Sequence, residues 1–383
     1  MLRAVLHNSP ISRAELARVT GLSKQTMSEV VRELEDDGWL RVTGRTQGNI
    51  GRSAVTYELE SRRAFLIGID VGGTKMHAAI ADLTGAVVDE LMEETDSRGG
   101  SHVIDQIVRL SQRLANNAAI DRKAVKVGAV GIPGAVSPRT KLVSMMPNIS
   151  GLAGTNLEAI LKKQLGYEVI VENDVNMAAK GEQWLGQGRT IDNFVLVALG
   201  TGIGMGIVND GRLVRGAKGA AGEISTLPIG ADPYDSRTCA AGALESAIGS
   251  IAISARYEGL GGTPGLTVRE LFDRHDDPLV AIVIDEVARV LATALQAISA
   301  VVDPETIIFG GSVGARNELV ARVTHHLERC MPTPVPCTIS VLGSQAALFG
   351  AIISSLERFQ EMLLGMSGGA LDYMPIRYLE KSA

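Results

Sequence analysis

Two short glycine-rich segments of this sequence have the residue types needed to approach a phosphate group. The first follows the apolar run 65–69, which is expected to be a buried strand ending in Asp70. It comprises Gly72, Gly73, Thr74 and Lys75. A glycine turn between antiparallel strands lets backbone N–H groups come close to phosphate oxygens. Asp70 could hold Mg²⁺ through water, because Mg²⁺ uses few carboxylates and keeps most of its waters.

The same pattern recurs later in the chain. A strand is expected over 193–199, a second over 205–209, and between them lies a turn that contains Gly200, Thr201, Gly202 and Gly204. This repetition predicts two similar lobes that face each other across a cleft. A Gly-x-Gly-x-Gly run also occurs in dinucleotide-binding fingerprints, but no helix is expected after this turn, which weakens that alternative.

One carboxylate between the two turns is the candidate for proton transfer. A buried strand is expected to end at Glu172, and Asp174 falls in the first turn of the helix that follows. An aspartate at this point can simply cap a helix. Its place between two phosphate-type turns also makes it a candidate general base, which would take a proton from a sugar hydroxyl during attack on a phosphoryl group.

The first sixty residues indicate a different chemistry, that of DNA binding. Ser12 and Glu15 form a capping box at the start of a short helix, Gly21 suits its left-handed end, and Ser23 begins a second helix. The second helix has the apolar stripe of a buried face and leaves polar side chains near its N-terminus, where the dipole favours phosphate. The predicted DNA-binding residues of this helix are Ser23, Lys24, Gln25, Thr26 and Ser28.

A hairpin is predicted after the two helices. Strands over 39–42 and 55–59 flank a polar, glycine-containing segment with Arg45 and Arg52, which would reach an adjacent groove. Caps, turn, apolar stripe and wing follow one another in the order of a winged helix-turn-helix. The alternative is a helix-turn-helix used only for protein contacts.

Length, composition and charge limit the classes of protein to which this chain can belong. The chain has 383 residues, too many for one typical domain, and a formal net charge of −6. This charge is not that of a typical nucleic-acid-binding protein, so a DNA-binding face must come from local clustering. No apolar run is long enough for a membrane span and no signal peptide opens the chain, so a cytoplasmic protein without a membrane partner is expected. The helix expected at the very start looks clipped, so an upstream start of the natural chain is an expectation here.

Taken in order, the motifs resemble the ROK family of repressors and sugar kinases, specifically its branch of xylose- and N-acetylglucosamine-repressor-like regulators with an N-terminal winged helix. The motifs that carry the resemblance are Asp70–Lys75, Gly131–Gly134, Pro147–Asn148, Glu172–Asn176, Gly200–Gly202, Gly219–Glu223, Leu244–Glu245 and Ile308–Gly311. The resemblance implies an α/β chain in which a winged helix precedes a two-lobed, actin-like ATPase fold. It also implies a homodimer or homotetramer.

The resemblance implies roles at matching positions. The implied sugar-binding set is Asn148, Asn173, Asp174, Glu223 and Glu245, with Asp174 also the catalytic base in kinase members. Paired carboxylates and amides at the end of a cleft suit sugar hydroxyls. The predicted nucleotide-binding residues are Asp70, Gly72, Gly73, Thr74, Lys75, Gly200, Thr201, Gly202, Gly310 and Gly311.

One departure from the family pattern concerns its structural zinc site, which uses three cysteines and a histidine. The matching positions here are Thr226, Ser236, Thr238 and Ala243. None of these side chains can replace a zinc thiolate. The sequence therefore predicts that zinc is absent.

The predicted organisation has four segments. Residues 1–60 form the winged helix, 64–182 the first lobe, 183–350 the second lobe with sugar-binding and oligomerisation surfaces, and 351–383 a helix and tail that return to the first lobe. The predicted function is a sugar-responsive DNA-binding regulator, expected to be a repressor, whose partners are operator DNA and a small sugar or sugar derivative. The alternative is an ATP-dependent sugar kinase, with ATP and Mg²⁺ as cofactors and Asp174 as the base.

Overall fold

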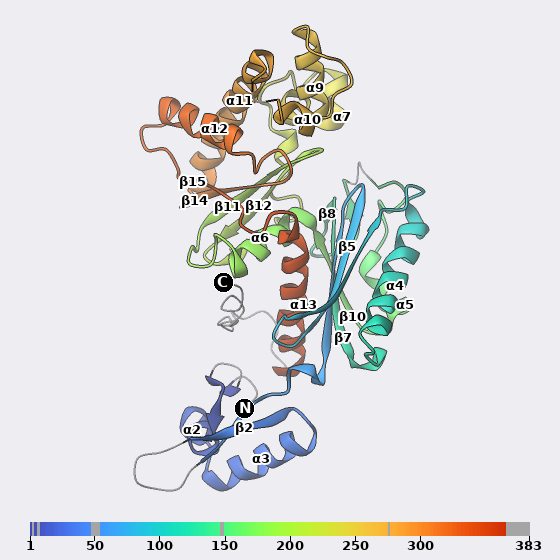
Figure 1. Ribbon diagram of the computed structural model, residues 1–383, viewed down its shortest axis with the longest axis vertical. Helices are drawn as coiled ribbons and strands as arrows, with labels where there is room; N and C mark the ends of the chain where they lie inside the picture. Colours follow the sequence, from blue (N-terminus) through green and yellow to red (C-terminus); the bar gives the residue numbers. More distant parts are fainter. Residues whose placement is uncertain (2–3, 6–7, 47–53, 146–148, 275, 365–383) are drawn as a thin grey trace.

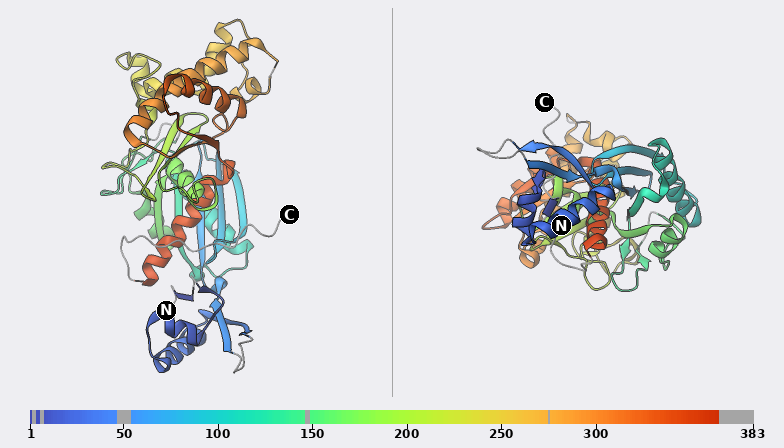
Figure 2. Two further views of the ribbon diagram at one scale, coloured as in Figure 1. Left: turned by 90° about the vertical axis from the view of Figure 1, so that its left-hand side faces the viewer. Right: turned by 90° about the horizontal axis from the view of Figure 1, so that it is seen from below.

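A computed structural model of the chain describes residues 1, 4–5, 8–46, 54–145, 149–274 and 276–364. The predicted site residues Arg52 and Asn148 lie outside this range. The molecule is elongated, with the N-terminal unit at one end and a group of helices at the other (Figures 1 and 2). Two β-sheets lie between these ends.

The N-terminal unit is a winged helix-turn-helix, as predicted. Its elements are β1 (Ile11–Ser12), α2 (Arg13–Thr20), α3 (Lys24–Asp36), β2 (Leu40–Thr46) and β3 (Ala54–Leu59). The predicted caps are confirmed: Ser12 forms the capping box with Glu15, Gly21 is left-handed with φ of 72°, and the Ser23 hydroxyl accepts from the Thr26 amide. The short strand β1 was not predicted, and it pairs with β3 to complete a three-stranded sheet in the order β1-β3-β2.

The first sheet of the body has the strand order β10-β7-β4-β5-β6. Its strands are β4 (Phe65–Val71), β5 (Lys75–Asp82), β6 (Val87–Glu94), β7 (Val125–Ile132) and β10 (Glu168–Asn173). Strands β4, β5 and β6 form an antiparallel meander, whereas β7 and β10 run parallel to β4. Helices α4 (Gly100–Asn117) and α5 (Leu157–Leu165) cover one face (Figure 1), and a small hairpin of β8 (Ala135–Val136) and β9 (Val143–Ser144) follows β7.

The second sheet repeats this arrangement, in the order β13-β12-β11-β14-β15. Its strands are β11 (Phe194–Leu199), β12 (Ile203–Asn209), β13 (Arg212–Leu213), β14 (Thr306–Gly310) and β15 (Cys337–Ile339). Again the first three strands are antiparallel and the last two are parallel to the first. The predicted internal repeat is therefore confirmed. The dinucleotide alternative is wrong, because a strand and not a helix follows the turn at Gly200.

Helices cover the outer face of the second sheet and form the far end of the molecule (Figure 1). They are α7 (Ser236–Ala241), α8 (Ala243–Ile248), α9 (Ser250–Gly259), α10 (Val268–Phe272), α11 (Pro278–Val302) and α12 (Asn317–Cys330). The long helix α11 begins with a proline at its first position and is followed by Asp303, its C-cap, in the left-handed conformation. In the part of the chain that the structure describes, no helix is long and apolar enough to cross a membrane.

Two crossing helices connect the sheets. Helix α6 (Asp174–Leu185) follows β10 and packs on β12, and α13 (Ala346–Leu364) packs on β4 and β7. The helices meet backbone to backbone at two glycines. A Cβ atom on Gly181 would lie 2.2 Å from the Ala346 oxygen, and one on Gly350 would lie 1.7 Å from the Met177 oxygen. Only glycine permits so close a crossing.

The end of α13 reaches the winged helix. Trp39, just before β2, stacks on Phe359 of α13 with ring centroids 6.2 Å apart. The Arg63 guanidinium also lies over the Trp39 ring, 5.3 Å from its centroid. Leu59 of β3 and Trp184 of α6 pack against the same apolar cluster. The winged helix thus contacts α13 near its C-terminal end (Figure 1).

Candidate functional site

Carboxylates gather where three parallel strands of the first sheet end. Asp70 on β4 is in register with Gly131 on β7, and Gly131 is in register with Glu172 on β10. A Cβ atom on Gly131 would lie 3.5 Å from the Asp174 Cα atom. The absence of a side chain at this position therefore leaves room for the start of α6 beside Asp70.

The strand-to-helix junction assigns separate roles to two neighbouring residues. Asn173 is the helix cap, because its Oδ1 accepts from the Asn176 amide at 3.0 Å. Its Nδ2 donates to the Gly134 oxygen at 3.3 Å. Asp174 is the first residue of α6, and its Oδ1 accepts from the adjacent Val175 amide at 2.9 Å. Asp174 is therefore not the cap, and one of its oxygens is left for a ligand.

Burial raises the pKa of all four carboxyl groups of this site, and neighbouring charges add to the effect at Asp174 and Glu223. Desolvation is the largest cause at Asp174, followed by the charge of Asp70, and together they raise the Asp174 pKa to about 7. Desolvation also raises the Asp70 pKa to about 7. The Glu223 pKa is raised by burial and by the charge of Glu245, and the Glu245 pKa is raised by burial. Such clusters of perturbed acids are typical of functional sites.

Asp174→Asn is expected to stabilise the ligand-free protein at pH 8. The folded chain holds the Asp174 proton more tightly than the unfolded chain does. The contribution of this protonated carboxyl to the stability of the wild type is therefore complete below pH 3.8 and is lost as the pH rises to about 7. Asparagine carries no charge and removes that cost. Because Asp174 retains some contact with solvent, we expect about 1–2 kcal/mol, less than the full shift would give. Urea unfolding at pH 4 and pH 8 measures the effect, and equal stability of the two proteins at pH 8 would contradict it.

Glu245 joins this cluster to the second glycine turn. Its Oε2 accepts from the Ile203 amide at 3.1 Å, and a Cβ atom on Gly202 would lie 2.7 Å from the same oxygen. The amides of Thr201 and Gly202 donate to no other atom of the described residues. They are therefore available to an anion, as the sequence predicted for this turn.

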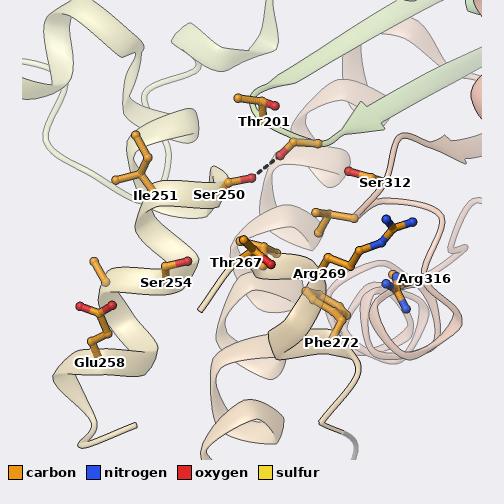
Figure 3. Close-up of a pocket in the computed structure, with 14 residues that line it drawn as sticks. Thr201, Ser250, Ile251, Ser254, Glu258, Thr267, Arg269, Phe272, Ser312 and Arg316 are labelled. Carbon is orange, nitrogen blue, oxygen red and sulfur yellow. Dashed lines mark hydrogen bonds between the residues drawn. The ribbon is translucent and has the colours of Figure 1, made fainter. Parts of the chain in front are cut away.

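A pocket of about 570 Å³ opens beside this turn (Figure 3). Ser250 of α9 donates to the Gly200 oxygen at 2.5 Å and lies at one side of the pocket, and Arg269 and Arg316 lie at the other side. Arg316 is paired with Asp273 at 3.0 Å. Sequence reasoning missed these pocket residues, because each comes from a helix with no motif of its own.

The first glycine turn and the pair Gly310 and Gly311 have defined geometry as well. Gly72 donates to the Lys75 oxygen at 2.9 Å, which closes the turn between β4 and β5 around Gly73 and Thr74. Gly310 ends β14, and Gly311 has φ of 81° with no space for a Cβ atom, because the Leu199 oxygen would lie 2.3 Å away. Gly311 thus packs directly against the strand that leads into the second turn.

The predicted DNA-contacting side chains lie on the exposed start of α3. The Ser23 and Thr26 hydroxyls bond each other at 2.9 Å, the Ser28 hydroxyl donates to the Lys24 oxygen at 2.9 Å, and Gln25 donates to Glu29 at 3.4 Å. The Lys24 ammonium has no partner among the described residues. Arg45 is exposed on β2 of the wing. Lys24 is therefore the cation of this helix start that is free to meet a phosphate.

A family model for ROK proteins matches residues 66–357. The chain belongs to the ROK family. A second model, for the MarR family, matches residues 1–48 and so covers the two helices of the N-terminal unit. The resemblance that the motifs indicated is thereby confirmed, and so is the α/β organisation with a winged helix ahead of the ROK body.

Relatives of this ROK chain include regulators and kinases. The xylose repressor of Bacillus subtilis is 28% identical over 229 residues, which span 60% of this chain and 59% of the repressor. The crystal structure of a ROK family transcriptional regulator, a homolog of the E. coli MLC protein, has a TM-score of 0.77 at 24% identity and covers 95% of this chain and 96% of that one. A ROK glucokinase from Streptomyces griseus, solved with glucose and AMPPNP, has a TM-score of 0.65 at 25% identity over 77% of this chain and 100% of its own.

The segment that would carry the family's zinc is held by hydrogen bonds. Asp235 caps α7 by accepting from the Arg237 amide at 2.9 Å, and the Thr238 hydroxyl donates to the Asp235 oxygen at 2.9 Å. Gly242 lies against the Ser225 oxygen, which would be 2.2 Å from a Cβ atom. Within the described ranges, no group of three or more His, Cys, Asp or Glu side chains is placed to hold a metal ion.

Proposed function

We propose that this ROK protein is a sugar-responsive, DNA-binding transcriptional repressor. A winged helix precedes the ROK body, and the xylose repressor of Bacillus subtilis, a relative of this chain, carries this activity in its name. The sugar would lie between Asn173, Asp174, Glu223 and Glu245, whose amide and carboxylate oxygens suit hydroxyl donors. The stack of Trp39 on Phe359 of α13 is the observation that carries the proposal, because α13 packs along α6, the helix that begins at Asp174.

The path between the two sites is short and consists of packed elements. Helix α6 begins at Asp174, crosses α13 at Gly181, and ends near Trp184, which packs in the cluster that includes Phe359 and Trp39. A sugar that draws the lobes together would shift α6 against α13. Packed contacts of this kind transmit small displacements, because a close-packed interior has little room to absorb them.

The proposed repressor acts as a homodimer with two winged helices. Helix-turn-helix dimers bind half-sites about one turn, roughly 34 Å, apart, so a small change in the spacing of the two units prevents both from docking. A sugar that binds one arrangement better than the other shifts the population toward it. Selection of binding fragments from genomic DNA, followed by operator binding with and without a panel of hexoses and pentoses, tests this function. Failure to select any fragment at low salt would overturn it.

Trp39→Ala is expected to uncouple the two ends of the molecule. Loss of the ring removes the stack on Phe359 and the Arg63 contact, while the core of the winged helix, formed by residues such as Met27 and Tyr57, stays intact. Operator affinity without sugar should therefore change less than threefold, whereas the effect of the sugar on that affinity should fall at least fivefold. Fluorescence anisotropy with a labelled operator measures both. Undiminished release of the variant by sugar would show that the signal takes another route.

A second candidate function is ATP-dependent sugar phosphorylation. It is favoured by Asp174 at the site and by the pocket beside Thr201 and Gly202, whose free amides fit phosphate oxygens. In such an enzyme Asp70 would hold Mg²⁺ through water and the pocket would hold the nucleoside, and the bound pair would supply an activated phosphoryl group. Asp174 would accept the proton of the sugar hydroxyl, most effectively above its pKa of about 7.

If the protein is a repressor and not a kinase, the wild type should release no more ADP in the presence of sugar than the Asp174→Asn variant does. A coupled assay with ATP, Mg²⁺ and the same sugar panel at pH 8 measures this. Sustained turnover that is lost in Asp174→Asn would make the protein a kinase.

A further inference from the structure

One loop of the second lobe spans both sheets beside the sugar site. It leaves β13 with the Val214 amide bonded to the Ile207 oxygen at 2.8 Å. In its middle, a Cβ atom on Gly219, where φ is 80°, would lie 2.0 Å from the Val136 oxygen of β8. The loop ends at Glu223, which belongs to the carboxylate cluster. Its backbone is therefore fitted closely against the first lobe.

An ion pair near the start of this loop joins it to the first sheet. The Arg215 Nε atom donates to the Glu172 Oε2 atom at 2.5 Å. The other carboxylate oxygen, Oε1, accepts from the Asn173 amide at 3.0 Å and from the Asn176 Nδ2 atom at 3.1 Å. Glu172 is 5% exposed and Asn176 is 1% exposed, so this network lies inside the protein at the start of α6.

We propose that Arg215 is a positioning residue for the sugar site, which couples closure of the two lobes to the orientation of Asn173 and Asp174. This rests on the proposed sugar-binding function. The guanidinium pairs with one oxygen of Glu172, and the other oxygen fixes the first turn of α6 through Asn173 and Asn176. Both ends of the coupled unit thus face the sugar: Glu223 at one end of the loop, and Asp174 at the start of the helix that Arg215 orients.

The surroundings of Arg215 favour a contact that can form and break. The side chain is 43% exposed and lines a cavity of about 410 Å³ together with Glu172 and Lys180. Lys180 is paired with Glu357, so it is not free to replace the guanidinium. When the lobes separate, Arg215 has space to leave. Glu172 then loses the one charged partner that it has among the described residues, in an interior where an unpaired charge is unfavourable.

Arg215→Gln and Arg215→Lys in the full-length protein test this, with Arg212→Gln as the matched control on the exposed end of β13. In Arg215→Gln without sugar, the rate of hydrogen–deuterium exchange should be at least fivefold higher than in the wild type in peptides that cover 173–177 and 219–223. In Arg215→Lys the increase in this rate should be smaller. Arg212→Gln should match the wild type. Exchange that stays unchanged in Arg215→Gln, or that rises equally in all three variants, would overturn the proposal.

Affinity for D-glucose and D-xylose, measured by calorimetry, provides the second readout. For the sugar that binds, Arg215→Gln should weaken affinity at least tenfold, Arg215→Lys should restore part of it, and operator affinity without sugar should stay within twofold. Equal sugar affinity of Arg215→Gln and wild type would also overturn the proposal. If neither sugar nor any other in the panel binds the wild type, the proposed function fails, while the exchange measurement still decides the role of Arg215.

Discussion

Glu223→Ala is expected to abolish the response to sugar while leaving DNA binding intact. Glu223 is placed at the end of the loop that crosses to the first lobe, and its charge is felt at Asp174 on the opposite side of the site. Hydrogen bonds to a charged group contribute about 1.5–3 kcal/mol each. A carboxylate that accepts from two sugar hydroxyls would therefore account for about 100-fold in affinity or more.

The measurement combines sugar affinity by calorimetry with operator affinity by anisotropy. Glu223→Gln keeps the shape of the side chain and removes the charge, so it should show an intermediate loss of sugar affinity. Glu328→Ala, an exposed glutamate on α12, is the control and should behave as the wild type. If Glu223→Ala were still released from DNA at the sugar concentration that releases the wild type, Glu223 would not belong to the sugar site.

Lys24→Ala is expected to weaken operator binding about five- to tenfold at 100 mM salt without changing sugar affinity. The Lys24 ammonium lies at the N-terminus of α3, where the helix dipole also favours phosphate, and it has no partner among the described residues. Removing one phosphate contact should also reduce the slope of log affinity against log salt by about 1. Lys163→Ala removes an exposed lysine from α5 and serves as the control.

The salt dependence distinguishes a direct phosphate contact from a loss of folding. A Lys24→Ala protein that is merely unstable would lose affinity at every salt concentration and would show a lower melting temperature. A direct contact leaves the melting temperature unchanged and changes the slope. If neither operator affinity nor slope changed, α3 would not be the recognition helix.

Local chemistry made much of this fold predictable. Ser12, Gly21 and Ser23 determine helix ends through backbone bonds within three or four residues, so their roles could be inferred from spacing alone. The two glycine turns were equally local, because each closes a hairpin between neighbouring strands. By contrast, β1 has only two residues and forms through pairing of Ile11 with Tyr57, a contact distant in sequence that no short pattern reveals.

The parts of the site that sequence reasoning missed all depend on long-range contacts. Arg215 contacts Glu172 across 43 positions of the chain, and Ser250 contacts Gly200 across 50. Neither residue lies in a motif, so its role follows only from the packing of the two lobes. Asp174 is a local example of the same difficulty. The spacing of the sequence allowed either Asn173 or Asp174 to be the helix cap, and the structure shows that Asn173 is the cap.

The central claim is that sugar and operator bind to one coupled molecule, and reciprocal linkage tests it most directly. Sugar affinity is measured by calorimetry with and without a saturating operator fragment, and operator affinity is measured with and without saturating sugar. We expect each ligand to change the other's affinity by the same factor, at least fivefold, because both act on one equilibrium. Sugar and operator affinities that are each indifferent to the other ligand would contradict it.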